Sequence, residues 1–453
     1  MALKKNRIIP LRIESLSSDG SGVGRFEGEA VFVPGTAPGD VLQARIVKDQ
    51  RTYAFGIVEQ LSSPSSAHIQ PDCPVYHPCG GCCFRHISYE AELDAKQGFV
   101  QDAFDRIGGI HIPIRPILPS PQRDRYRNKV QFPVQQLPDG RVQAGFYAGR
   151  THRVVPCGDC KLQPEVLNQI AAFICRWMEQ FHVPAYDETA HTGLVRHIFL
   201  RRGAHSGAIM VCLVVNGRTL PHSQILCEQV MRRFPAVATV ILNVNQRRTN
   251  VILGSENIVL TGPGYIEDEL CGVPVRLGPL SFYQVNSPAA AQLYESARGY
   301  AALGPNDTLL DLYCGMGTIG LSMASQCQAL VGVEIVPEAV KSAHANAKRM
   351  GVDNARFICA DAGQAARQLA SEGLRPDVAI LDPPRKGCDS ATLHALLAMG
   401  PRRIVMVSCN PSTAARDTAF LAQNGYAPVE AQPADLFPRT RHVECVVLLE
   451  KRP

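Results

Sequence analysis

Short apolar runs alternate with helical stretches from about residue 280 to the end of the chain. The apolar runs occupy residues 308–312, 329–335, 355–360, 378–381, 404–407 and 445–449. Stretches of helical character lie between them, for example residues 337–350 and 412–424. Strands that alternate with helices form a parallel, doubly wound sheet, which binds its ligands at the carboxyl ends of the strands. We therefore predict an α/β fold, Rossmann-like in this part of the chain, with functional residues in the loops after the strands.

The length of 453 residues exceeds one typical domain, and we predict three parts, at residues 1–61, 70–270 and 271–453. The net charge of +5 is too small to indicate a nucleic-acid partner by itself. Sixteen cysteines would suggest disulfides in a short secreted chain, but the first residues contain no apolar stretch of a signal peptide. No run approaches the ~20 apolar residues of a membrane span. We expect a monomer in a reducing cytoplasm, with no membrane contact.

Residues 6–61 alternate apolar and polar positions and carry turn signals at Asp19-Gly20 and Pro34-Gly35. About five short strands with glycine turns predict a small β-barrel of the OB type, a common scaffold for nucleic-acid binding. The segment from Asp19 to Arg25, with the later Pro38-Gly39-Asp40, resembles the TRAM domain of RNA-modifying proteins. A barrel that only braces its neighbour is the alternative.

Residues 70–270 mix short β patterns with cysteines and basic residues, which indicates a central α+β domain. Nine lysines and arginines stand against three acidic residues between positions 115 and 161. Four aromatic residues are interleaved with them: Tyr126, Phe132, Phe146 and Tyr147. Cations bind phosphates and aromatic rings stack on unpaired bases, so this segment favours RNA contact over a merely solvated strand surface.

A glycine-rich turn follows the strand expected at residues 308–312. Asp311 lies in this strand, and Cys-Gly-Met-Gly at 314–317 opens a helix where backbone can approach a ligand closely. Glu334 lies at the end of the next strand, where a carboxylate can accept from both ribose hydroxyls, and Asp361 closes the third, within reach of an adenine amino group. Taken singly, Glu334 or Asp361 could also be a solvent-exposed acid in a loop, without a ligand. We expect S-adenosylmethionine as the cofactor here, with a nicotinamide cofactor as the alternative.

A thiol follows another expected strand, in the Ser-Cys-Asn-Pro sequence at 408–411. Uracil C5 is a poor nucleophile, and a thiolate that adds to C6 turns the ring into an enolate with electron density at C5. Cys409 suits this role at the end of a strand in a sheet with cofactor signals, whereas an isolated cysteine would be read as an inert buried thiol. Removal of the C5 proton needs a base, and Glu444 in a partly apolar pocket is the candidate.

Four pieces of sequence together resemble the S-adenosylmethionine-dependent RNA uracil-C5 methyltransferases. They are Phe-Tyr-Gln-Val-Asn at 282–286, Asp-Leu-Tyr-Cys-Gly-Met-Gly at 311–317, Leu-Asp-Pro-Pro-Arg at 381–385, and Ser-Cys-Asn-Pro at 408–411 with His-Val-Glu at 442–444. With the TRAM-like barrel, the resemblance covers nearly the whole chain. It implies that Cys409 is the nucleophile, Glu444 the base, and Phe282 a contact of the target base. It also implies contacts with the cofactor and its surroundings from Gln284, Tyr313, Glu334, Asp361 and Asp382. Thr318, which stands where some members of the family have Asn, is a further candidate cofactor contact.

Four cysteines form a candidate metal site: Cys73, Cys79, Cys82 and Cys160. Four thiolates suit tetrahedral zinc or a four-iron cluster, and spacing alone does not separate the two. Cys83 and Cys157 are spare thiols beside these ligands. Members of the resembled family with this pattern hold a [4Fe-4S] cluster, so the resemblance implies iron–sulfur at the four cysteines. We expect it to stabilise the fold and the RNA-binding surface, because methyl transfer needs no electron.

The predicted function is transfer of a methyl group from S-adenosylmethionine to C5 of a uridine in RNA, through a covalent cysteine–C6 adduct. The large platform of barrel and cluster domain favours 23S ribosomal RNA, with transfer RNA as the alternative. Methylation of an exocyclic amino group also uses an Asp-Pro-Pro loop, but Arg385 stands where an aromatic residue would stack the base. A radical S-adenosylmethionine enzyme would need Cys-x3-Cys-x2-Cys, whereas the first gap here is five residues. A non-catalytic RNA-binding assembly factor would need neither Cys409 nor Glu444.

Overall fold

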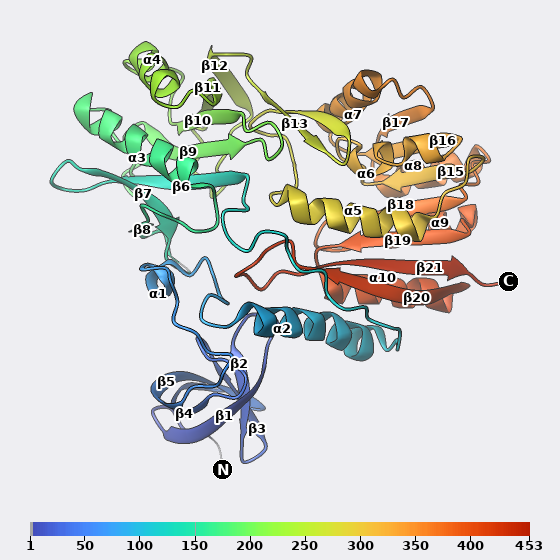
Figure 1. Cartoon of the computed structure of the whole chain (residues 1–453), viewed down its shortest axis with the longest axis horizontal. Coiled ribbons are helices and arrows are strands. Elements are labelled where there is room, and N and C mark those ends of the chain that lie inside the picture. Colours follow the sequence, from blue (N-terminus) through green and yellow to red (C-terminus); the bar gives the residue numbers. More distant parts are fainter. Residues whose placement is uncertain (1–2, 150) are drawn as a thin grey trace.

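The computed structural model describes residues 3–149 and 151–453. Three parts follow one another along the chain: an N-terminal barrel, a central sheet, and a C-terminal sheet between layers of helices (Figure 1). Within the described residues, no helix combines the length and the apolar character that crossing a membrane requires.

The N-terminal part is a closed barrel with the strand order β1-β2-β3-β5-β4. Its strands are β1 (Ile8–Leu16), β2 (Gly22–Phe26), β3 (Glu29–Val33), β4 (Val41–Asp49) and β5 (Tyr53–Ser63). Alternate residues of β1 and β4 point inward, so Ile9, Leu11 and Ile13 pack against Leu42 and Ile46. The predicted small barrel is confirmed.

Helical segments connect the barrel to the rest of the chain: α1 (Tyr76–Cys79), α2 (Tyr89–Asp102) and the π-helical turn η1 (Ala103–Gly108). The hydroxyl of Ser88 accepts from the N–H of Ala91 at 3.2 Å and so caps the start of α2. Val100 and Phe104 are buried in the hydrophobic core of the C-terminal sheet. Helix α2 therefore packs on that sheet, beside β20 and α10 (Figure 1). More than 300 positions of sequence separate α2 from these two elements.

The central sheet has the strand order β12-β11-β10-β9-β6-β7-β8. Its strands are β6 (Lys129–Gln136), β7 (Val142–Tyr147), β8 (Val154–Pro156), β9 (Val195–Arg202), β10 (Ile209–Val215), β11 (Val237–Val244) and β12 (Glu256–Thr261). Helices α3 (Glu165–Gln180) and α4 (Ser223–Arg233) cover one side, where Trp177 and Met178 pack with Ile198. On the other side, Phe199 and Cys212 join the core that this sheet shares with the C-terminal part.

The hairpin of β13 (Ile266–Leu270) and β14 (Val273–Leu277) leads into the C-terminal sheet. That sheet has the order β17-β16-β15-β18-β19-β21-β20. Its strands are β15 (Thr308–Leu312), β16 (Ala329–Glu334), β17 (Ala355–Cys359), β18 (Val378–Leu381), β19 (Arg403–Ser408), β20 (Tyr426–Ala434) and β21 (Glu444–Lys451). Each of the expected strands is present, and β20 is an additional one.

Strands β15 to β19 are parallel, as predicted, but β21 runs antiparallel to both β19 and β20. The prediction of a parallel sheet throughout is therefore wrong at this edge. The physical reason is that a loop, and no crossover helix, joins β20 to β21, and a loop returns the chain as an antiparallel neighbour.

Helices cover both sides of the C-terminal sheet. They are α5 (Ser287–Ala301), α6 (Thr318–Leu321), α7 (Pro337–Met350), α8 (Ala362–Ser371), α9 (Ser390–Met399) and α10 (Pro411–Gln423), with a 3-10 turn η2 (Ala324–Gln326). Helices α5, α6 and α7 share one core, and α8, α9 and α10 share the other with α2. This doubly wound arrangement confirms the predicted fold class and leaves the carboxyl ends of β15, β16, β18 and β19 as the edge where loops meet.

Candidate active site

The antiparallel pairing of β19 and β21 brings Cys409 beside Glu444. Ser408, the last residue of β19, pairs with Cys445, near the start of β21. Cys409, which follows Ser408, therefore lies opposite Glu444, which precedes Cys445, although the two are 35 positions apart in the sequence. Strand β21, which the sequence mispredicted as parallel, therefore brings the predicted base next to the predicted nucleophile.

Glu444 is an almost fully buried carboxyl group, with 4% of its surface exposed. Burial first and the charge of Asp382 second raise its pKa, Arg385 opposes them, and the pKa of Glu444 is raised to about 8. A carboxyl whose pKa is near neutral can take a proton and release it again, as a general base requires.

Cys409 is half-buried at the start of the loop after β19. Burial raises the pKa of its thiol, and the Glu444 carboxylate raises it further by repulsion between like charges. Arg385 opposes both effects by its charge and by a hydrogen bond. The thiolate is therefore favoured when Arg385 faces it and Glu444 is neutral.

Sequence reasoning gave Arg385 no role at this site. Its carbonyl accepts from Asn410 Nδ2 at 3.0 Å and from Thr413 Oγ1 at 3.4 Å, so the start of α10 fixes its loop. The available signal was its position, directly after the strand-end acid Asp382 and two prolines.

Asp311 and Asp382 are neighbouring acids at the carboxyl ends of β15 and β18. The pKa of each is raised to about 7. Burial is the cause for Asp382 and the main cause for Asp311, where the charges of Asp382 and Glu334 also raise the pKa and the N–H of Gly320 lowers it. The N–H of Gly320 donates to Asp311 Oδ2 at 3.0 Å, whereas Oδ1 has no partner within residues 3–149 and 151–453. A Cβ at Gly320 would lie 2.7 Å from Asp311 Oδ2, so only glycine allows this approach.

Glu334 and Asp361 both organise backbone at the ends of β16 and β17. Glu334 accepts from the N–H of Gly315 at 3.1 Å and of Val336 at 2.8 Å, so it fixes the glycine loop. Asp361 Oδ1 accepts from two N–H groups at the start of α8 and caps that helix. The sequence predicted ligand contacts here; the structure adds these structural roles and leaves the ligand contacts untested.

Two further predicted cofactor residues lie around the same loop. The hydroxyls of Thr318 and Tyr294 are 3.2 Å apart. Tyr313 donates to Thr392 Oγ1 at 3.3 Å and has a φ of 66°, a left-handed conformation that a tyrosine rarely adopts. Such strained residues concentrate at functional sites.

The loop from β14 to α5 carries Phe282 and Gln284. Phe282 is 71% exposed, which is unusual for a large apolar side chain. Asn128, directly before β6, donates to the carbonyl of Gln284 at 2.8 Å through its side chain and to that of Val285 at 2.9 Å through its backbone. The loop is thus held against the central sheet and presents Phe282 to solvent.

The aromatic residues of the basic segment divide into two kinds. Tyr126 and Phe132 are 4% and 1% exposed, and Tyr126 donates to the carbonyl of Pro438 at 3.0 Å. The expectation that these two stack on RNA bases is therefore wrong, because both rings pack in the core. Phe146 and Tyr147 are half-buried.

One cavity of about 270 Å³ collects the predicted metal ligands. Its lining includes Cys73, Cys79, Cys82, Cys157 and Cys160. A hydrogen bond with Cys157 lowers the pKa of Cys160, so Cys157 competes with the four predicted ligands. Cys83 instead lies against the barrel, with its Cβ 3.0 Å from the position that a Cβ on Gly20 would take.

The donor set of this cavity fits a thiolate-ligated centre. Arg85 and Arg127 also line it and act electrostatically on Cys82, as cations beside an anionic centre would. Within the part of the chain that the structure describes, no three His, Cys, Asp or Glu side chains converge as ligands of one metal ion.

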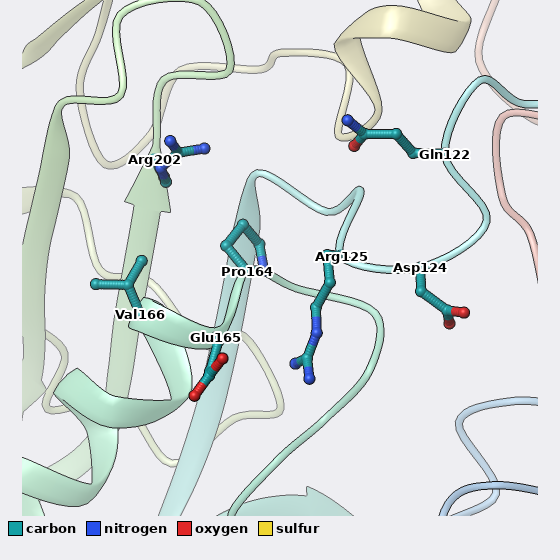
Figure 2. A pocket seen from close by; sticks show the side chains of 7 residues that line it. All are labelled: Gln122, Asp124, Arg125, Pro164, Glu165, Val166 and Arg202. Atoms are coloured by element: carbon teal, nitrogen blue, oxygen red, sulfur yellow. The ribbon is translucent and has the colours of Figure 1, made fainter.

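A second cavity, of about 630 Å³, lies between β9, α3 and the loop before β6 (Figure 2). It is lined by Gln122, Asp124, Arg125, Pro164, Glu165, Val166 and Arg202. Arg125 is paired with Asp159 at 2.7 Å, and the lining carries both signs of charge. The predicted catalytic residues Cys409 and Glu444 are not among its lining residues.

Comparison with known proteins identifies the family. The model of the tRNA (Uracil-5-)-methyltransferase family matches residues 274–452, and that of the TRAM domain matches residues 2–58. An uncharacterized RNA methyltransferase from Halalkalibacterium halodurans is 41% identical over 449 residues, which cover 99% of this chain and 98% of the relative. This chain belongs to the RNA uracil-5-methyltransferase family with a TRAM domain. An uncharacterized RNA methyltransferase from Clostridium tetani is 38% identical and covers 99% and 97% of the two chains.

A solved structure is similar to this methyltransferase over almost its full length. It is the tRNA (uracil-54, C5)-methyltransferase of Pyrococcus abyssi in complex with S-adenosyl-L-homocysteine. The TM-score is 0.77 at 25% identity, and the match covers 97% of this chain and all of the other. The predicted family, enzyme class and fold are confirmed.

Proposed function

We propose that this enzyme transfers a methyl group from S-adenosylmethionine to C5 of a uridine in 23S ribosomal RNA, with Cys409 as nucleophile and Glu444 as base. The observation that carries the proposal is the register of β19 and β21, which sets the two side chains next to each other at the ligand-binding edge of the sheet. The exposed Phe282 on the neighbouring loop suits a role beside the target base.

In the proposed reaction, the Cys409 thiolate forms a bond to C6 of the uracil, and the C5–C6 π electrons become an enolate. Carbon C5 then takes the methyl group, and S-adenosylhomocysteine is released as product. Glu444 removes the C5 proton, and the electron pair of that C–H bond expels the Cys409 thiolate from C6. The Arg385 cation assists the first step because it favours the thiolate over the thiol.

The methyl donor would supply an electrophilic methyl group when bound at the carboxyl ends of β15 to β18. The unpartnered Asp311 Oδ1 and the close glycine loop support a polar ligand there. We propose as its contacts the residues Gln284, Tyr313, Thr318, Glu334, Asp361 and Asp382. The Oδ2 atom of Asp361 can accept a hydrogen bond from the methyl donor, because both capping hydrogen bonds use Oδ1.

We further propose a [4Fe-4S] cluster on Cys73, Cys79, Cys82 and Cys160, in a protein that works in the reducing cytoplasm as a monomer. The shared cavity and its flanking arginines support it. Iron and acid-labile sulfide analysis of anaerobically purified protein is the test, and stoichiometric zinc without sulfide would contradict it. Cys160→Ala should lose iron and Cys157→Ala should retain it; the opposite pattern would make Cys157 the ligand.

Mass mapping of 5-methyluridine in RNA from cells with and without the protein tests the reaction and its substrate. Loss of one site in 23S ribosomal RNA is expected. Loss at transfer-RNA position 54 instead would favour the second candidate, which the Pyrococcus abyssi neighbour suggests by its name. Unchanged levels in both RNAs would reject the assignment.

RNA that carries 5-fluorouridine tests the covalent step, because fluorine at C5 cannot be removed as a proton. The adduct should accumulate on Cys409 and be visible as a shifted band on denaturing gels. Cys409→Ala should form none, while Cys388→Ala, which removes a buried thiol from the loop before α9, should form it normally. An adduct in Cys409→Ala would place the nucleophile elsewhere.

A further inference from the structure

The cavity of about 630 Å³ at the end of β9 is the larger of the two cavities described above, and it is open to solvent. Its volume lies within the range of about 300–1,000 Å³ that is usual for ligand sites. Arg202, the last residue of β9, and Gln122 stand on opposite sides of it, with Pro164 between them (Figure 2). A ligand can therefore reach this cavity from solvent.

The wall of the cavity that precedes β6 is joined at both ends to the loop from β14 to α5. At one end, Asn286 donates through Nδ2 to Ser120 Oγ at 3.0 Å, and Ser120 Oγ donates to the carbonyl of Gln122 at 2.7 Å. At the other end, Asn128 donates to two carbonyls of the same loop, and its own carbonyl accepts from the N–H of Arg202 at 2.8 Å. The cavity is therefore held beside the loop that carries Phe282.

Three polar side chains of the lining are free to bind a ligand. The guanidinium of Arg202 and the side-chain amide of Gln122 form no hydrogen bond or ion pair within residues 3–149 and 151–453. Glu165, the first residue of α3, accepts from Gln169 Nε2 through Oε1 at 3.0 Å, and its Oε2 is free of hydrogen bonds in the same part of the chain. The cavity thus offers a cation, an amide and a carboxylate oxygen.

The other charged residues of the lining are already paired and serve to fix the wall. Asp124 is paired with Arg85, and Arg125 with Asp159. Arg125 also donates through Nη1 to the carbonyl of Cys160 at 2.8 Å, and its φ of 60° is a left-handed conformation that arginine rarely adopts. Strained residues that are fixed in this way concentrate at functional sites.

We propose that this cavity binds a nucleotide that flanks the target uridine in the substrate RNA, and that the base of this nucleotide carries an amino group. The inference rests on the proposed function for the position of the target uridine. Proteins read single-stranded RNA by hydrogen bonds to the edges of splayed bases. Enzymes that flip a base choose their substrate partly by contacts with the flanking nucleotides.

Each free group of the cavity has one role in this assignment. Arg202 binds the phosphate, and Gln122 hydrogen-bonds the edge of the base. Pro164 and Val166 supply the apolar surface on which the base rests. The Glu165 carboxylate only accepts hydrogen bonds, so it favours the amino group of adenine, cytosine or guanine over uracil, whose base carries a single ring N–H as donor. Its charge also repels phosphate and so directs the phosphate to Arg202.

The first test compares two fluorescein-labelled octanucleotides that bind to the purified, metal-replete protein: octauridylate, and the same strand with one internal adenine. The wild type should bind the adenine strand at least about threefold more tightly, as one net hydrogen bond allows. Glu165→Ala should bind both strands equally. Glu338→Ala is the matched control, because it removes an exposed carboxylate from the first turn of another helix, α7, and it should keep the preference.

The second test is the salt dependence of the same binding. Loss of one phosphate contact reduces the slope of log K against log salt by about 0.7 for a single strand. Arg202→Gln should show this reduction and bind both strands about three- to tenfold more weakly at low salt. Arg202→Lys should keep the slope, and so should Arg452→Gln, which removes an exposed cation after the end of β21.

Equal affinity of the wild type for the two strands would overturn the assignment of the base, as would an undiminished preference in Glu165→Ala. Wild-type slope and affinity in Arg202→Gln would overturn the site itself. Failure of the proposed function is distinguishable from these results, because the wild type would then form no 5-methyluridine, whatever the affinities and salt slopes of the variants.

Discussion

Lys96 on helix α2 donates to Asp435 in the loop before β21, with 2.7 Å between Nζ and Oδ1 and 339 positions between the residues. Glu92 accepts from the same ammonium at 2.7 Å, and the three side chains are fully buried. The N–H of Arg439 donates to Glu92 at 2.7 Å. The cluster therefore fixes the loop that ends at Glu444 to the helix after the barrel.

Lys96→Met should destabilise the protein by about 3–5 kcal/mol, because it leaves two buried carboxylates without their cation. Chemical denaturation measures this as a lower midpoint. The matched control is Lys341→Met on α7, whose pair with Glu338 is exposed, and it should leave the midpoint unchanged. Equal midpoints for Lys96→Met and the wild type would show that the cluster adds nothing to stability.

Gly320→Ala should weaken binding of S-adenosylhomocysteine by at least about tenfold, because the added Cβ would lie 2.7 Å from Asp311 Oδ2 and displace the loop. Isothermal titration calorimetry gives the affinity. Gly98→Ala is the control: this position in α2 has open space around it, and alanine should stabilise the helix by about 0.5–1 kcal/mol. Wild-type affinity in Gly320→Ala would mean that Asp311 does not shape the cofactor site.

The local pattern of apolar residues was sufficient to predict features that depend on a single strand or helix. The helix expected at 337–350 is α7 with the same bounds. The strand ends placed Asp311 near the end of β15, and Asp382 and Cys409 in the loops after β18 and β19, all at one edge of the sheet. Strand β20 was not predicted because Pro428 and Pro433 interrupt its apolar pattern, and prolines are tolerated in it as an edge strand.

Contacts between distant parts of the chain were beyond sequence reasoning. Nothing in the local sequence pairs Lys96 with Asp435, or sets Lys129 opposite Arg201 across β6 and β9. The cysteine pattern predicted four metal ligands, yet it could not show that Cys157 lines the same cavity while Cys83 is not among the lining residues. These facts depend on how sheets and loops meet in three dimensions.

Arg385→Met should move the rise of kcat/KM to higher pH, because the arginine lowers the pKa of both Cys409 and Glu444. Both groups must lose a proton to act, so the variant should be most impaired near neutral pH and partly recover in alkali. The pH profile of methyl transfer from labelled S-adenosylmethionine measures this. Arg385→Lys keeps the charge and should keep most of the wild-type profile. An identical profile for Arg385→Met would exclude an electrostatic role.

Glu444→Gln should abolish turnover and stabilise the fold at alkaline pH. Burial raises the pKa of Glu444 from 4.5 to about 8, so between these values the native state holds a proton that the unfolded state has released. Stability from this group is therefore lost as the pH rises from about 5 to 8, where the charge is forced into the buried site. The variant, which is neutral at every pH, should exceed the wild type by about 1–3 kcal/mol at pH 9 and match it near pH 4.

For the wild type, the same titration predicts a kcat/KM at least about tenfold lower at pH 6 than at pH 8, because the base is protonated at the lower pH. Thermal unfolding across the pH range and single-turnover methylation give both quantities on the same samples. Glu450→Gln at the other end of β21 is the control, since its carboxylate is partly exposed and pairs with Arg403, and it should retain activity. A Glu444→Gln enzyme that turns over normally would place the base on another residue.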